Sequence, residues 1–222
     1  MKIKLLAVAI TALVSTGAAM IIHAQSSSQQ SERTVNILQE PRHRTVHSDG
    51  DLRVLDVQIN PGDSTLPHTH DSAILYTFIS NGEGALNGRV SSTTSYVNEH
   101  YTHSVNNPGP ELFRIIALAN YGPAVVAAAD VPIDLSPQLE NEWFRSYRLE
   151  LAPGQSSASY LHNFPVLIVQ VGNGLLHVSR ADGITSELDA MGDWAWRDAG
   201  TAYQIHNRSD QPVSVVINEG KR

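Results

Sequence analysis

Apolar and polar residues alternate with a period of two along most of the chain beyond residue 40. In RVLDVQIN, residues 53–60, the side chains of Leu55, Val57 and Ile59 alternate with polar ones, which is typical of a half-buried β-strand. Similar patterns predict further strands at residues 73–80, 112–119, 145–151, 166–171, 175–180 and 213–218. Only a short piece near residues 137–144 has any helical periodicity. The sequence therefore predicts an all-β protein.

Three dipeptides between these segments predict hairpin turns. They are Asn81-Gly82, Asn173-Gly174 and Asp182-Gly183. Glycine and asparagine accept the positive φ that tight turns require, so each dipeptide is expected to join two neighbouring strands.

The chain also contains an internal repeat. Three features recur 92 positions later: Pro61-Gly62 at Pro153-Gly154, His70 at His162, and Asn81-Gly82 at Asn173-Gly174. Asn107 recurs as Asn207 at an offset of 100, so the second copy has about eight extra residues around the hairpin at 179–193. Such turn dipeptides also recur by chance, but three equal offsets in the same order favour two copies of one β-unit, joined near residues 130–141.

The first residues have the pattern of a secretory signal peptide. Lys2 and Lys4 form a basic start, Leu5–Val14 is apolar, and residues 22–24 form a permissible cleavage site. An uncleaved membrane anchor is the alternative, but it needs about 20 consecutive apolar residues, and polar residues interrupt this stretch. We expect a signal peptide at residues 1–24, a flexible leader at 25–40, and a periplasmic or secreted protein without a stable membrane anchor after cleavage.

Composition limits the chemistry that the chain can perform. Its 222 residues include no cysteine, which excludes disulfides and thiolate metal sites. The formal net charge is −7, and no cluster of Lys and Arg is present. An acidic chain of this kind is a poor candidate for binding nucleic acid or an anionic membrane surface.

The stretch PGDSTLPHTHDSAILYTFISNG, residues 61–82, contains the candidate site. His68 and His70 are two residues apart, and on a strand both side chains point to the same face. A lone histidine on a strand is usually structural, whereas a pair on one face is a candidate for binding a metal ion. Imidazole suits iron, manganese, zinc, nickel or copper.

These residues resemble the cupins, whose first motif has a glycine, five residues and then His-x-His. Here Gly62 precedes His68-Thr69-His70 by that spacing, and Gly82 falls at the closing glycine. A second motif survives as residues 103–107, with Asn98 and His100 where Pro and Gly are usual. In the second copy, residues 192–193, 198–200, 203 and 207 follow the second motif. Over about residues 45–220 the chain resembles a secreted bicupin, with a metal-binding barrel at 41–130 and a degenerate barrel at 141–222.

The resemblance implies that His103 completes a metal site with His68 and His70. The family's glutamate is missing, because Leu75 and Ile74 stand at its place. A carboxylate from Asp71, Glu83 or Glu99 is an alternative, and so is His100 as a ligand. In the second copy the corresponding positions are Tyr160, His162, Leu167 and Tyr203, so we expect no metal there. Because only neutral imidazole binds metal, affinity is expected to fall below about pH 6.

Among cupins, a three-histidine site resembles those of iron(II) dioxygenases. The resemblance therefore implies a divalent metal, iron(II) first, and oxygenation of a small organic molecule. Two alternatives remain open. A zinc, manganese or nickel ion would support an isomerase or lyase, and a non-catalytic protein would bind a sugar or an acid in the first barrel and form a homodimer through the second.

Overall fold

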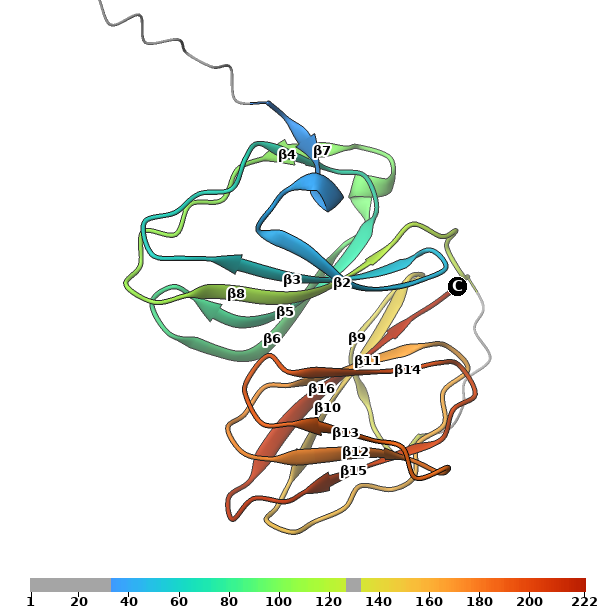
Figure 1. The fold of residues 1–222 in the computed structure, drawn as a ribbon. Helices are drawn as coiled ribbons and strands as arrows, with labels where there is room; N and C mark the ends of the chain where they lie inside the picture. The colour runs from blue at the N-terminus through green and yellow to red at the C-terminus, as the bar shows by residue number, and fades with distance from the viewer. Residues whose placement is uncertain (1–32, 127–132) are drawn as a thin grey trace, which may run out of the picture. The chain divides into compact units, whose positions relative to one another are not determined.

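The computed structural model describes residues 33–126 and 133–222 (Figure 1). These residues are almost entirely β-structure, with two 3₁₀ turns, η1 (Ile37–Gln39) and η2 (Ser95–Val97). The strands are β1 (Val35–Asn36), β2 (His43–Asp49), β3 (Leu52–Ile59), β4 (His68–His70), β5 (Ala73–Asn81), β6 (Ala85–Thr93), β7 (Tyr101–His103), β8 (Phe113–Asn120), β9 (Pro137–Glu140), β10 (Phe144–Leu151), β11 (Val166–Gln170), β12 (Leu176–Arg180), β13 (Thr185–Leu188), β14 (Trp194–Arg197), β15 (Tyr203–Asn207) and β16 (Val213–Gly220). Within these ranges no helix is long and apolar enough to span a lipid bilayer.

The seven strands predicted from alternation are all present. They are β3, β5, β8, β10, β11, β12 and β16, each within two residues of its predicted bounds. The helical periodicity near residues 137–144 was misleading, because that segment forms β9 and the start of β10. The all-β fold class is confirmed.

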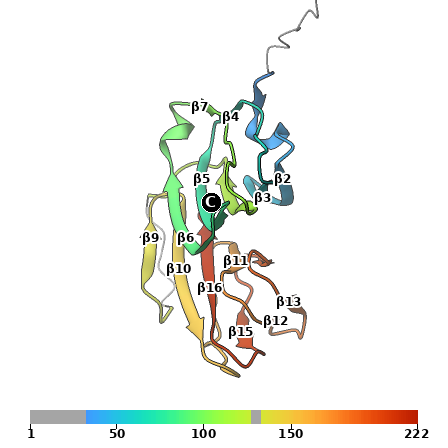
Figure 2. The ribbon, with the colours of Figure 1, turned by 90° about the vertical axis from the view of Figure 1, so that its left-hand side faces the viewer.

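The described residues form two halves with related sheets. In the first half a five-stranded sheet has the order β2-β3-β8-β5-β6 and a small sheet the order β1-β4-β7. In the second half the orders are β9-β10-β16-β11-β14 and β13-β12-β15. β10 begins 92 positions after β3, and β16 begins 100 positions after β8, and in each half these two strands are antiparallel neighbours. Figure 2 shows β10 beside β16. The offsets of the sequence repeat are therefore those of equivalent strands.

Two asparagines have the same role in the two halves. The Nδ2 atom of buried Asn107 donates to the carbonyl oxygen of Ile59 at 2.9 Å, at the end of β3. The Nδ2 atom of buried Asn207 donates to the carbonyl oxygen of Leu151 at 2.9 Å, at the end of β10. Each amide thus holds its own loop against the end of an equivalent strand, β3 in the first half and β10 in the second.

The central strands of the larger sheet of the first half, β3, β8 and β5, are buried on both faces. On β5, Leu75 packs into an apolar cluster shared with Phe144 and Leu167 of the second half. Its neighbours Ile74 and Tyr76 point to the other face, into a cluster made by the first half alone. Because successive side chains alternate between faces, one strand contributes both to the contact between halves and to the interior where the histidines lie.

Alternation alone does not show that both faces of β3 are covered. Asp56, one of its polar positions, is 5% exposed, although a half-buried strand would leave it in water. Its carboxylate accepts hydrogen bonds from Arg44 at 2.7 Å and from Nε of Arg114 at 3.1 Å. The guanidinium of Arg114 also donates to the carbonyl oxygens of Met191 and Gly192 in the second half. The polar face of β3 therefore contributes to the contact between the halves.

The structure tests the predictions for the amino-terminal segment only in part. The predicted signal peptide, residues 1–24, and residues 25–32 of the leader lie outside the described residues. The rest of the predicted leader is built into the fold, because Val35 and Asn36 pair with β4 and Ile37 is fully buried. The flexible leader predicted over residues 25–40 therefore does not extend through Val35–Ile37, which belong to the fold.

Two of the three predicted hairpin turns join neighbouring strands. Gly82, with φ of 84°, lies between β5 and β6, and Gly183, with φ of 87°, lies between β12 and β13. Asn173-Gly174 also forms a turn, but the strands that it joins, β11 and β12, belong to different sheets. The third hairpin prediction was wrong because a turn dipeptide specifies backbone geometry and not which strands pair.

Candidate metal centre

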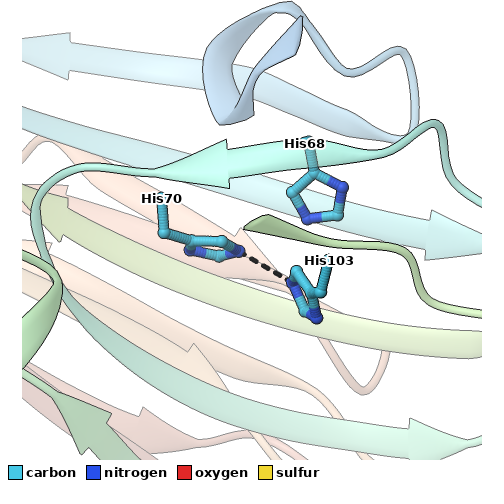
Figure 3. Close-up of side chains that lie close together, drawn as sticks. All are labelled: His68, His70 and His103. Atoms are coloured by element: carbon cyan, nitrogen blue, oxygen red, sulfur yellow. Dashed lines mark hydrogen bonds between the residues drawn. The ribbon is translucent and has the colours of Figure 1, made fainter. Parts of the chain in front are cut away.

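Strands β4 and β7 bring three histidines together (Figure 3). His68 and His70 lie on β4 and are 0% and 3% exposed, which agrees with their expected position on one buried face. His103 ends β7 and lies directly opposite His68 in the antiparallel pair. One ring nitrogen of each histidine lies within 4.8 Å of the other two. The structure therefore brings together the three residues that sequence and resemblance selected.

His68 presents one nitrogen with no hydrogen-bond partner. Its Nδ1 lies 2.8 Å from the carbonyl oxygen of Leu66, and a carbonyl only accepts, so Nδ1 carries the proton and donates. The Nε2 atom is then unprotonated and carries a lone pair, and it is buried without a hydrogen-bond partner. Metal-ligating histidines have this arrangement, in which the second nitrogen donates to a carbonyl and fixes the tautomer.

His70 and His103 are spaced as two ligands of one ion would be. Their Nε2 atoms lie 3.0 Å apart, as the dashed line in Figure 3 marks. Two nitrogens at about 2.1 Å from one ion, with a right angle between them, are separated by about 3 Å. Together with the unpartnered Nε2 of His68, this spacing shows that the three histidines could hold a divalent metal ion.

Burial favours the neutral form of His70 and His103. Desolvation, followed by the neighbouring His103, His68 and His43, lowers the pKa of His70 to about 3. Desolvation and then His68 also lower the pKa of His103. Since neutral imidazole is the form that binds metal, the pH below which metal is lost should lie lower than the value of about 6 expected from isolated imidazole.

No carboxylate joins the three histidines among the described residues. The candidates Asp71, Glu83 and Glu99 are not part of the group, and Asp71 instead accepts a hydrogen bond from Asn36 at 2.8 Å. At the family's glutamate position, Leu75 points into the cluster between the halves and Ile74 faces the interior of the first half.

His100 is not part of the candidate metal centre. Its side chain is exposed, and the group of facing nitrogens does not include it. Although it is three residues from His103, it precedes β7 instead of lying on the strand. His100 is therefore a useful control position for experiments on the site.

Sequence reasoning missed a fourth histidine beside the site. His43 is 6% exposed, and its ring centroid lies 4.4 Å from that of His68. Its Nδ1 lies 2.7 Å from Oε2 of Glu40, which is 1% exposed. Burial raises the pKa of Glu40, but hydrogen bonds from His43 and from the backbone N–H groups of Leu66 and Arg42 outweigh it, so the net pKa is lowered. No motif in the sequence pairs these two residues.

A cavity of about 280 Å³ opens beside the histidines. His43, His70 and His103 line one part of it, and most of the remaining wall is apolar, contributed by strands of the larger sheet and by Tyr76 and Tyr96. Burial raises the pKa of Tyr76, so its phenol stays neutral. A small molecule in this cavity would therefore reach the face of the metal centre formed by His70 and His103.

The equivalent place in the second half is filled by a hydrogen-bonded network. His162 is 2% exposed, and its Nδ1 lies 2.5 Å from Oε1 of Glu219. Tyr203 is paired with Tyr160 through a β-bridge, and its hydroxyl lies 2.9 Å from Nε2 of His162. Both ring nitrogens of His162 therefore have protein partners.

The comparisons with known proteins agree with the fold. No protein-family model matches the sequence, and no curated protein matches it. AerE from Microcystis aeruginosa is similar over 82% of this chain and 99% of its own, with 13% identity and a TM-score of 0.57. A cupin 2 conserved barrel domain protein from Leptotrichia buccalis matches 80% of this chain and 88% of its own, with 11% identity and a TM-score of 0.49. A cupin domain from Bordetella pertussis Tohama I matches 40% of this chain and 92% of its own, with 25% identity and a TM-score of 0.35.

The similarity to AerE shows a shared fold. The paired sheets of each half give the all-β architecture that the sequence predicted. Within that fold, the first half brings together three histidines that could hold a metal ion. The domain boundaries at 41–130 and 141–222 stay a prediction.

Proposed function

We propose that this protein is an exported metal-binding cupin that uses iron(II), held by His68, His70 and His103, to oxygenate a small organic molecule. One observation carries the proposal. The buried Nε2 of His68 has no partner, and it belongs to the same group as two nitrogens spaced 3.0 Å apart. An unpartnered buried polar atom is costly to a fold, and a metal ion would satisfy it.

The ligand set favours iron(II) and dioxygen. Three neutral nitrogens without a carboxylate leave several coordination positions open, and iron(II), when bound, would supply room for an organic molecule and dioxygen side by side. The protein contributes the dry surroundings, because His68 and His70 are buried and the cavity walls beside them are mostly apolar.

The test is the metal content and the oxygen dependence of the purified protein. Near-stoichiometric metal is expected in the wild type, and the iron(II)-loaded protein should consume dioxygen with a substrate and stop when oxygen is removed. Protein that binds no first-row metal would overturn the proposal.

A second candidate is Lewis-acid chemistry on zinc, manganese or nickel, as in an isomerase or lyase. The all-histidine ligand set favours it, since imidazole binds most first-row ions. Equal turnover with and without oxygen would support this candidate. The third alternative, a binding protein for sugars or acids, has no support from the mostly apolar cavity.

Export is part of the proposal and rests on the sequence of residues 1–24 alone. The mature protein is expected to begin at or near Gln25. N-terminal analysis of protein recovered from the periplasm or the medium tests this, and an intact Met1 in that material would contradict it. A homodimer formed through the second half also stays a prediction.

A further inference from the structure

The cavity beside the histidines contains features that select its ligand. None of the described residues that line it is Lys, Arg, Asp or Glu. Its polar side chains are His43, His70, His103, Tyr76 and Tyr96, and the remainder are apolar. In metal-free protein a charged ligand would lose its hydration there without gaining a counter-ion, which is strongly unfavourable. The walls therefore favour an uncharged molecule.

The volume limits the size of that molecule. A dry cavity of about 150 Å³ lined by apolar side chains is enough to bind benzene. The cavity here is about 280 Å³, which suits one ring with short substituents. Phe78 and Phe113 are among its walls, and aromatic side chains pack well against a ring.

His43 supplies a fixed hydrogen-bond acceptor at the polar end. Its Nδ1 is engaged by the carboxylate of Glu40 at 2.7 Å, and a carboxylate accepts, so Nδ1 carries the proton. Its Nε2 is then unprotonated and carries a lone pair, so it is the ring nitrogen that can accept a hydrogen bond from a ligand. Glu40 is itself held by the backbone N–H groups of Arg42 and Leu66, so this arrangement does not depend on the ligand.

We propose that the first half binds a small, uncharged, largely apolar molecule with a hydroxyl group, of which a phenol is the simplest kind, and that His43 accepts the hydrogen bond from this hydroxyl. The inference rests on the proposed function, because it names the molecule that would reach the metal centre. Glu40 is the positioning residue, since it holds the acceptor tautomer of His43. The hydroxyl would lie at the same end of the cavity as His70 and His103.

Three probes of similar size test the class of ligand: 4-ethylphenol, its methyl ether 4-ethylanisole, and 4-ethylbenzoate. Binding is measured by calorimetry on protein with and without metal, so the test does not depend on activity. The phenol should bind about five- to tenfold more tightly than the ether, the effect of one hydrogen bond. In metal-free protein the benzoate should bind more weakly than either.

Variants assign the preference to His43. In His43→Phe the preference for the phenol over the ether should disappear while the ether still binds. His43→Gln, which keeps an acceptor oxygen, should restore part of it. Glu40→Gln should reduce it, because an amide can donate to Nδ1 and reverse the tautomer. His100→Phe, on an exposed histidine of the same half, is the matched control and should retain the full preference.

The outcomes separate this inference from the metal proposal. Absence of binding by all three probes, tighter binding of the benzoate by metal-free protein, or an unchanged phenol preference in folded His43→Phe would each overturn the inference. Loss of metal in both His43 variants would also overturn the inference, because His43 would then be a fourth metal ligand and not the acceptor for the hydroxyl. A wild type that binds no metal but prefers the phenol would support the ligand class and contradict the proposed function.

Discussion

Tyr160 and Tyr203 are paired by a β-bridge in the second half at the place where His68 and His103 are paired in the first. The sequence offsets, 92 for the first member and 100 for the second, are those of the repeat. In the first half the two facing histidines belong to the group that could hold a metal ion. In the second half the facing residues are tyrosines, and the hydroxyl of Tyr203 is a hydrogen-bond partner of His162. One β-framework thus carries two different side-chain sets, and the consequences can be measured.

The first prediction concerns the three histidines of the candidate metal centre. Replacing His68, His70 or His103 with Ala removes one of three protein ligands, with no carboxylate in reserve. Bound metal, measured by elemental analysis, should fall to near background in each variant, and His100→Ala should retain it. Full retention in all three folded variants would reduce these histidines to packing residues.

The second prediction concerns His162. His162 is buried, and its Nδ1 is the partner of Oε1 of Glu219, whose Oε2 lies 3.8 Å from the guanidinium of Arg145. His162→Ala should leave Oε1 without its hydrogen bond and lower the free energy of unfolding by about 1–3 kcal/mol, while Arg145 still compensates the charge. Substitution of a semi-buried residue without such a partner typically costs less, about 0.5–1.5 kcal/mol. Urea unfolding measures the loss, with His177→Ala, a partly exposed histidine, as the control. Metal content should not change, and loss of half the metal would place a second site in this half.

The third prediction concerns pH and stability. Burial lowers the pKa of His43 to about 4 and that of His70 to about 3, whereas both have a pKa of about 6.5 in the unfolded chain. Between about pH 6.5 and 4 the unfolded state therefore binds more protons than the folded state. The free energy of unfolding of metal-free protein should fall with decreasing pH across this window, by on the order of 2 kcal/mol at pH 5 for each of the two histidines. Urea titrations at pH 7 and pH 5 measure this loss of stability. Equal stability at both pH values would contradict the lowered pKa values of His43 and His70.

The fourth prediction concerns metal binding and pH. Since desolvation lowers the pKa of His70 to about 3, the apoprotein should keep this imidazole neutral at pH 5, and desolvation lowers the pKa of His103 as well. Dialysis at decreasing pH, followed by metal analysis, should show retention at pH 5 and loss nearer pH 4. Complete loss already at pH 6 would show that the histidines titrate as exposed imidazoles do.

The fifth prediction concerns the contact between the halves. Nδ2 of Asn218 donates to Oγ1 of Thr77 at 2.9 Å, and both residues are fully buried. Thr77→Val keeps the shape but removes the acceptor, so stability should fall by about 1–3 kcal/mol. Thr45→Val, on an exposed position of β2, should change it by less than about 0.5 kcal/mol. A neutral Thr77→Val would indicate that water replaces the hydroxyl.

Alternation and turn residues were sufficient to predict the all-β class and the long strands. Strands such as β3, β5 and β8 have a strong period-two pattern because their side chains alternate between two environments. The short strands β4 and β7, with three residues each, have too few positions for a pattern. The repeat offsets predicted which strands are equivalent, because duplicated strands keep their turn residues and their buried asparagines.

The candidate site, like the fold, was predictable from the sequence only in part. His68 and His70 could be paired from sequence because strand geometry places residues i and i+2 on one face. The place of His103 came from the cupin motif, and the structure confirms its proximity. His43 and Glu40 could not be predicted, because their position beside the site follows from the pairing of β2 with β3 and of β1 with β4. Alternation within a strand is a local property of the chain, whereas burial on both faces of a strand and the meeting of distant side chains depend on how sheets pack, which only the tertiary structure determines.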